Sequence, residues 1–206
     1  MVKKTRRSRL IAASRSENAI HLFLAALVLL ATSLQAAEVI PPKPDRYFND
    51  YAGIVSKEAA DRFNEQLAQF ERETSDQVVV SVFPKMQSDS DIADYTQRVA
   101  QAWGVGQKER RNGAVLFVFI QDRKMFIQVG YGLEGALPDI TAFDITEYHI
   151  KPLFRNGNYE GGLGGGPIFI PTGGAGGWSS GGGGGGFSGF SGGGGSFGGG
   201  GAGSSW

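Results

Sequence analysis

Residues 113–130 read GAVLFVFIQDRKMFIQVG, two apolar runs separated by the polar residues Gln121-Asp122-Arg123. The first run extends from Gly113 to Ile120 and the second from Lys124 to Gly130, and both have the length and the β-branched or aromatic content of a strand. Because the link between them is so short, the two strands must run antiparallel, as a hairpin. The stretch therefore predicts two neighbouring strands of a β-sheet.

A third strand is predicted upstream of this hairpin. Residues Gln77 to Phe83 read QVVVSVF, and a β-branched run with little alternation is typical of a strand that is covered on both faces. Between this strand and the hairpin, the pattern predicts a helix that begins after Ser90 and ends at Gly104. A helix in this position permits a right-handed parallel crossover. We therefore expect a mixed sheet.

Two further helices are predicted around these strands. The first extends from Ser56, its N-cap, to about Thr74 and carries apolar residues at the spacing i, i+4, i+7. The second begins near Thr141, and we expect Ile145 and Tyr148 to face the core. The resulting order α-β-α-β-β-α predicts an α/β fold, a small mixed β-sheet covered by helices.

The N-terminal segment has the three-part layout of a secretory signal. A basic stretch is followed by an apolar run from Ile20 to Leu34, and Ala36 and Ala37 stand just before the polar Glu38. We predict that residues 1–37 are a signal peptide and that the protein is extracytoplasmic, either periplasmic or secreted. The apolar run of about 15 residues is shorter than the roughly 20 that span a bilayer. The alternative is an uncleaved leader that anchors the protein in the inner membrane.

The composition changes on both sides of the predicted domain, which we place at residues 47–163. Residues 38–46 contain three prolines and are expected to form an extended tether. Residues 164–206 are rich in glycine, serine and phenylalanine, and ordering so many glycines costs backbone entropy with little apolar return. We expect this tail to be disordered, acting either as a passive spacer or as a contact for a partner through its aromatic residues.

Composition excludes several kinds of chemistry. The chain has no cysteine, which removes disulfides, thiolate metal sites and thiol nucleophiles. Its two histidines are His21, in the leader, and His149, so one mature chain cannot build a histidine-rich zinc site. Residues 38–206 carry 14 basic and 19 acidic side chains, a net charge of −5, which argues against nucleic-acid binding. We expect no organic cofactor, because Gly104-Val105-Gly106 follows a helix and not a strand.

Four carboxylates lie in or beside predicted loops and are the candidate ligands of a divalent cation: Asp50, Asp122, Glu134 and Asp139. Carboxylate oxygens are hard ligands, which calcium and magnesium prefer. The alternative is structural: Asp50 and Asp122 make hydrogen bonds within turns, while Glu134 and Asp139 are solvated or cap the third helix. No residue identifies itself as a nucleophile, so the catalytic residues stay unassigned.

Several short motifs follow one another along the predicted domain. They are YFNDYAGIVS at residues 47–56, WGVG at 103–106, DRK at 122–124, QVGYGLEG at 128–135, and PLFR at 152–155 with Gly157 and Tyr159. In this order and spacing they resemble the TPM domain family, over roughly residues 47–163. That family includes thylakoid-lumen proteins of photosystem II repair and many exported bacterial proteins, often with a glycine-rich C-terminal tail.

The resemblance implies an extracytoplasmic accessory domain. Divalent-cation binding and acid phosphatase activity have each been ascribed to some members of the family. We therefore expect an accessory or interaction module of the cell envelope that binds Ca²⁺ or Mg²⁺ and a partner protein of the envelope or membrane, with membrane association through the leader if it is not cleaved. The alternative is a metal-dependent acid phosphatase that acts on phosphomonoesters.

Overall fold

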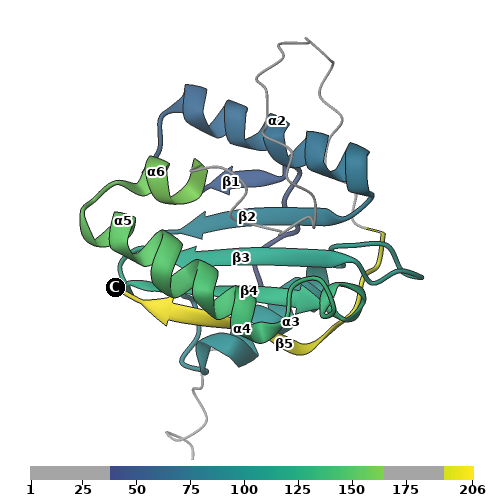
Figure 1. Cartoon of the computed structure of the whole chain (residues 1–206). Coiled ribbons are helices and arrows are strands. Elements are labelled where there is room, and N and C mark those ends of the chain that lie inside the picture. Colours follow the sequence, from purple (N-terminus) through teal and green to yellow (C-terminus); the bar gives the residue numbers. More distant parts are fainter. Residues whose placement is uncertain (1–37, 165–192) are drawn as a thin grey trace, which may run out of the picture. The chain divides into compact units, whose positions relative to one another are not determined.

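The structure is a computed structural model that describes residues 38–164 and 193–206 (Figure 1). Within these ranges, the chain from Val39 to the C-terminus forms one folded unit. The predicted signal peptide, residues 1–37, and residues 165–192 of the predicted tail lie outside the described residues. Among the helices that are described, none is long and apolar enough to cross a bilayer.

A mixed five-stranded sheet forms the centre of the fold, with the strand order β1-β2-β3-β4-β5. Its strands are β1 (Phe48–Asp50), β2 (Gln77–Phe83), β3 (Gly113–Phe119), β4 (Lys124–Gly130) and β5 (Phe197–Ser205). The pairs β1-β2 and β2-β3 are parallel, whereas β3-β4 and β4-β5 are antiparallel. The predicted mixed sheet, its hairpin and its parallel crossover are therefore confirmed, and β1 and β5 add an unpredicted strand at each edge.

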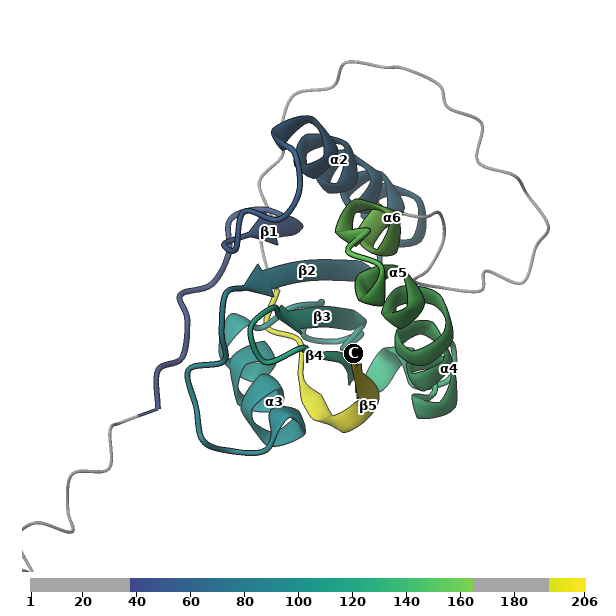
Figure 2. The same ribbon diagram turned by 90° about the vertical axis from the view of Figure 1, so that its left-hand side faces the viewer.

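Helices cover the sheet on both faces. They are α2 (Lys57–Thr74), α3 (Ile92–Trp103), a continuous helical run made of α4 (Asp139–Asp144), the π-helical turn η2 (Ile145–Ile150) and α5 (Lys151–Arg155), and finally α6 (Tyr159–Gly164). Figure 2 shows α3 on one side of the sheet and the run from α4 to α5 on the other. Trp103 of α3 packs on Phe117 of β3, with ring centroids 5.3 Å apart. The core thus extends on both sides of the central strands.

Local signals set the helix boundaries as the sequence predicted. The Ser56 hydroxyl accepts a hydrogen bond from the Ala59 N–H at the start of α2, and Gly104 ends α3 in the left-handed conformation.

Ile145 is buried as expected, but Tyr148 is 66% exposed, so the prediction that Tyr148 faces the core is wrong. It fails because the π-helical turn inserts an additional residue, which rotates Tyr148 away from the sheet.

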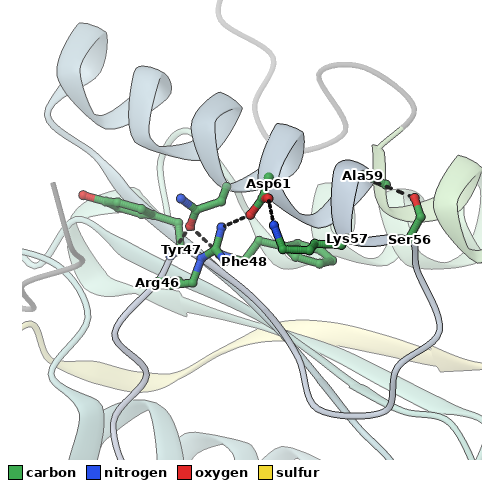
Figure 3. A network of polar contacts seen from close by, with 8 residues as sticks. Arg46, Tyr47, Phe48, Ser56, Lys57, Ala59 and Asp61 are labelled. Atoms are coloured by element: carbon green, nitrogen blue, oxygen red, sulfur yellow. Dashed lines mark hydrogen bonds and ion pairs between the residues drawn. The ribbon is translucent and has the colours of Figure 1, made fainter. Parts of the chain in front are cut away.

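Strand β1 is attached to α2 by side chains (Figure 3). The Asn64 Oδ1 atom accepts hydrogen bonds from the backbone N–H groups of Tyr47, at 2.9 Å, and Phe48, at 3.3 Å. Just before the strand, the Arg46 guanidinium lies 2.7 Å from an Asp61 carboxylate oxygen. The side chains of α2 therefore fix the position of an edge strand only three residues long.

The proline-rich segment before β1 is extended but packs against the domain. The Trp103 indole N–H donates to the Pro41 carbonyl at 2.9 Å, and the Tyr95 hydroxyl donates to the Val39 carbonyl at 2.9 Å. Pro44 is buried. The first residues of the predicted tether thus contact α3, and the folded unit begins at Val39.

The C-terminal strand corrects one expectation. Residues 197–205, which fall within the tail that we predicted to be disordered, form β5 and pair with β4 along its length. A sheet ladder satisfies backbone groups without any help from side chains, so a glycine-rich segment can be ordered once an edge is offered to it. Residues 165–192 of the tail are not described.

Candidate functional site

The most distinctive surface of the domain is the one that holds its own C-terminal segment. We name it the tail-binding edge: the outer side of β4 together with the loop at residues 104–106, Tyr131, Asp139 and Phe154. Strand β5 pairs there from Lys124↔Ser205 to Val129↔Gly200, with an irregularity at Gly130. Figure 1 shows β5 in yellow beside β4, at the edge of the sheet opposite β1. The edge binds an extended peptide by strand addition.

The loop that ends α3 holds the residues that precede β5. The Gly194 N–H donates to the Gly104 carbonyl at 3.0 Å, and the Gly193 N–H donates to the Gly106 carbonyl at 3.0 Å. The approach is close, because a β-carbon on Gly195 would lie 1.8 Å from the Val105 carbonyl oxygen. The motif Gly104-Val105-Gly106, which we did not expect to bind a nucleotide, contacts the backbone of the tail.

Two aromatic residues anchor the ends of β5. Phe197 is 4% exposed, and its N–H donates to the Gln101 side-chain oxygen at 3.0 Å. At the other end, the Trp206 ring meets the Phe154 ring edge-to-face, with centroids 4.8 Å apart and an interplanar angle of 74°. The Trp206 N–H also donates to the Arg123 carbonyl at 3.1 Å. Each anchor adds apolar contact to the backbone pairing between them.

Between the anchors, the edge has room for glycine alone at several positions. A β-carbon on Gly198 would lie 2.1 Å from a ring carbon of Tyr131, and one on Gly203 would lie 2.2 Å from the Met125 carbonyl oxygen. Gly201 has a φ of +133°, which side chains other than that of glycine rarely adopt. The glycines of this segment are therefore a condition for its binding and not a neutral spacer.

Two of the four candidate carboxylates lie at this edge. The Asp139 Oδ1 atom accepts a hydrogen bond from the Gly201 N–H at 2.7 Å. A β-carbon placed on Gly200 would lie 3.6 Å from the same Asp139 oxygen and 3.1 Å from Glu134 Oε1. Both carboxylates thus face the same space beside β5. Asp139 satisfies an outward-facing backbone donor of the edge strand, a role that its position in the sequence did not reveal.

The other two carboxylates accept hydrogen bonds from the backbone N–H groups of loops. The two oxygens of Asp50 accept four backbone N–H groups, from residues 52–55, at 2.8–3.0 Å. The Asp122 Oδ2 atom accepts the Met86 N–H at 2.7 Å. The bonds of Asp50 are turn hydrogen bonds of the kind that the structural alternative describes. The bond of Asp122 is different, because it joins the hairpin turn to the loop after β2, 36 residues away in the chain.

The topology separates the four candidates into two pairs. Asp50 is the last residue of β1 and Asp122 follows β3, at the C-terminal ends of these parallel strands, whereas Glu134 and Asp139 follow β4, which runs the opposite way. The two pairs therefore lie at opposite ends of the strands. Within the described residues there is no group of three or more acidic, histidine or cysteine side chains able to hold one metal ion. Cation binding by Asp50, Asp122, Glu134 and Asp139 stays a prediction.

The remaining residues of the tail-binding edge were not predicted. The contacts of Phe197, Trp206, Gln101 and Phe154 join segments that are about 50 to 100 residues apart in the chain, so no local pattern contains them. One signal was available: a hairpin strand whose other side has no predicted partner leaves an open sheet edge, and proteins usually cover such edges. Two aromatic residues one strand length apart in the tail were candidates for that cover.

Comparison with known proteins agrees with the sequence motifs. The family model of the TPM domain matches residues 48–166. No curated protein matches the chain.

Two solved structures are similar to this domain. The first is the N-terminal domain of a protein from P. gingivalis, determined by NMR in solution, with 31% identity, coverage of 59% of this chain and 77% of that chain, and a TM-score of 0.53. The second is the N-terminal domain of cg2496 from Corynebacterium glutamicum, with 17% identity, coverage of 60% and 76%, and a TM-score of 0.46.

Proposed function

Because the chain belongs to the TPM domain family, we propose that it is an exported accessory module of the cell envelope that binds protein segments and does not turn over a substrate. The layout of residues 1–37 supports export. The net charge of −5 in residues 38–206 supports a protein partner of the envelope or membrane over a nucleic acid.

The observation that carries this proposal is the strand addition at the tail-binding edge. Strand β5 lies on β4 in register, and its two ends are fixed by aromatic contacts. Backbone hydrogen bonds supply affinity in such complexes, while pockets and close contacts along the strand supply specificity. A domain with this edge has what is needed to recognise an extended peptide.

Glu134 and Asp139 favour a second candidate, a metal-dependent acid phosphatase. Both carboxylates face the space beside Gly200, and they are the residues that would hold a Ca²⁺ or Mg²⁺ ion there. A bound cation would polarise a phosphate oxygen. This candidate is weaker, because Asp139 already accepts the Gly201 N–H.

Export is tested with a reporter. Residues 1–46 are fused to a β-lactamase that lacks its own signal, and resistance to ampicillin in intact bacteria reports the location of the enzyme. We expect resistance, and we expect Leu27→Arg to abolish it, because a charge in the apolar run disrupts a secretory signal. Equal sensitivity of both fusions would contradict the proposed location.

Turnover is tested on the chain from residue 38 onward, which contains the whole folded unit. Release of phosphate from a simple aryl phosphate is followed at acidic pH with chelator, then with calcium or magnesium in excess, together with thermal unfolding. A ligand at 100 times its dissociation constant stabilises a protein by about 2.7 kcal/mol, so binding without turnover is also visible. We expect no phosphate release. Release that disappears in Asp139→Asn and persists in Asp122→Asn would replace our proposal with the phosphatase.

A further inference from the structure

We propose that the tail-binding edge accepts the C-terminal segment, residues 197–206, of a second copy of this chain, so that two copies exchange β5. This inference rests on the proposed function and names the ligand of the same site. It makes the glycine-rich tail a link between molecules as well as a part of its own domain.

The fit of the segment identifies its source. The edge takes a peptide with an aromatic residue at its start, glycines where Tyr131 and the Met125 carbonyl leave no room, and a tryptophan at its end. Phe197, Gly198, Gly203 and Trp206 meet all of these conditions. A second copy carries the same sequence, whereas a peptide with any residue other than glycine at the position of Gly203 would place its β-carbon about 2.2 Å from the Met125 carbonyl oxygen.

The connection between the domain and β5 permits exchange. Residues 165–192 join Gly164 to Gly193, and a chain of 28 residues spans at most about 95 Å. Gly164 lies against Phe63 of α2, while Gly193 lies against the loop after α3. This length of chain lets β5 pair with β4 of its own domain, and it also lets β5 reach β4 of a neighbouring molecule.

Exchange conserves the contacts of β5. The residues that hold the segment belong to α3, β4, the start of α4 and α5, and a second copy presents the same set. Two copies that swap β5 reciprocally form a closed pair, while one-way exchange forms an open chain of molecules. A tether gives the segment an effective concentration in the millimolar range toward its own domain. The exchanged form must therefore increase with protein concentration.

The register offers a direct way to observe exchange. Because the Trp206 N–H donates to the Arg123 carbonyl, the next pair, Lys124 and Ser205, is a non-hydrogen-bonded antiparallel pair, with Cα atoms about 4.5 Å apart. That separation suits a disulfide. Lys124 and Ser205 are both exposed, and the chain has no cysteine of its own, so an engineered pair reports on this contact alone.

The experiment mixes two single variants of the chain from residue 38 onward. Lys124→Cys and Ser205→Cys are combined over a range of concentrations and oxidised slowly, and the dimer that joins positions 124 and 205 is quantified by peptide mass. Lys57→Cys, whose side chain is 85% exposed on α2, mixed with Ser205→Cys measures random collision. Lys124→Cys combined with Ser205→Cys in one chain measures closure within a molecule.

We expect the 124–205 dimer to exceed the 57–205 dimer by about tenfold or more at high concentration, because strand pairing raises the effective concentration of the two thiols. Adding Gly203→Val to the Ser205→Cys chain should lower the yield of the 124–205 dimer to that of the 57–205 dimer, which measures random collision. If the double variant closes within one chain but the mixture gives only the collision level, exchange is overturned and the edge remains a binding site. If the double variant also fails to close, the strand addition behind the proposed function fails as well.

Discussion

The two edge strands of the sheet, β1 and β5, are held by opposite means. Strand β1 is fixed by side chains: Phe48 is 2% exposed and packs on Phe63 with ring centroids 5.1 Å apart. Asn64 accepts the backbone N–H groups of Phe48 and of Tyr47, the residue before the strand. Strand β5 has few side chains, and its fit depends on glycine at positions such as Gly201 and Gly203.

Because of this difference, we expect β1 to contribute to the stability of the fold and β5 to behave as a bound segment. Side chains of β1 continue into the core that α2 covers, so the strand cannot leave without opening that core. Strand β5 pairs through its backbone at a surface and can detach as a local unit, because regions with few buried apolar contacts open at low free energy. One edge therefore belongs to the folded core, and the other is a site that a segment occupies.

The largest expected effect is at β1. Phe48→Ala removes a buried ring and should lower the free energy of unfolding by about 3–5 kcal/mol, the range found for such truncations. The measurement is chemical denaturation of the chain from residue 38 onward. Phe143→Ala, at a position that is 36% exposed, is the matched control and should cost much less. Equal losses at the two positions would show that β1 is not part of the core.

A smaller loss of stability is expected from a substitution that adds a side chain where β5 contacts the backbone of β4. Gly203→Ala places a methyl group against the Met125 carbonyl and should detach the strand, with a loss of about 2 kcal/mol, because local detachment limits the cost. Hydrogen exchange at the β4 amides that face β5 should accelerate strongly. Gly200→Ala is the matched control, since its methyl group would meet side-chain oxygens of Glu134, at 3.1 Å, and Asp139, at 3.6 Å, and no backbone atom within 3.6 Å. Similar rates of hydrogen exchange at the β4 amides in both variants would show that the pairing of β5 does not require glycine at position 203.

The C-terminal anchor contributes less again. Trp206→Ala removes the edge-to-face contact with Phe154 and should weaken the docking of β5 by about 1 kcal/mol, seen as faster exchange of the same β4 amides with little change in global unfolding. Trp206→Phe keeps an aromatic ring on Phe154 and should restore most of the protection. If alanine and phenylalanine behave alike, the ring contact does not anchor the strand.

The central strands were predictable because their signals are local. The observed bounds of β2 and β4, Gln77–Phe83 and Lys124–Gly130, are those read from the sequence, since continuous β-branched and aromatic runs indicate buried strands. The caps Ser56 and Gly104 were predictable for the same reason. Each feature depends on residues that are close together in the chain.

The edge strands were not predictable, because other segments determine them. Strand β1 has three residues, too few to show a period, and its pairing depends on Asn64 in α2. Strand β5 reads as a disordered tail until the space beside Met125 and Tyr131 is known. The proximity of Glu134 to Asp139 at β5 was hidden in the same way, whereas the turn made by Asp50 was open to prediction from its neighbours.

The smallest expected effect concerns the charge pair that precedes β1. Hydrogen bonds from Arg46 and then Lys57 hold the pKa of Asp61 below its ordinary value, so this group stabilises the fold above its unfolded pKa of about 3.9 and loses that contribution as the pH falls through the lower folded value. Thermal midpoints of the native chain and Asp61→Asn should therefore differ slightly above about pH 5 and converge in stronger acid. Asp89→Asn, at an exposed position in the loop after β2, is the control. A difference that persists unchanged in strong acid would mean that the network of Figure 3 acts through packing and not through charge.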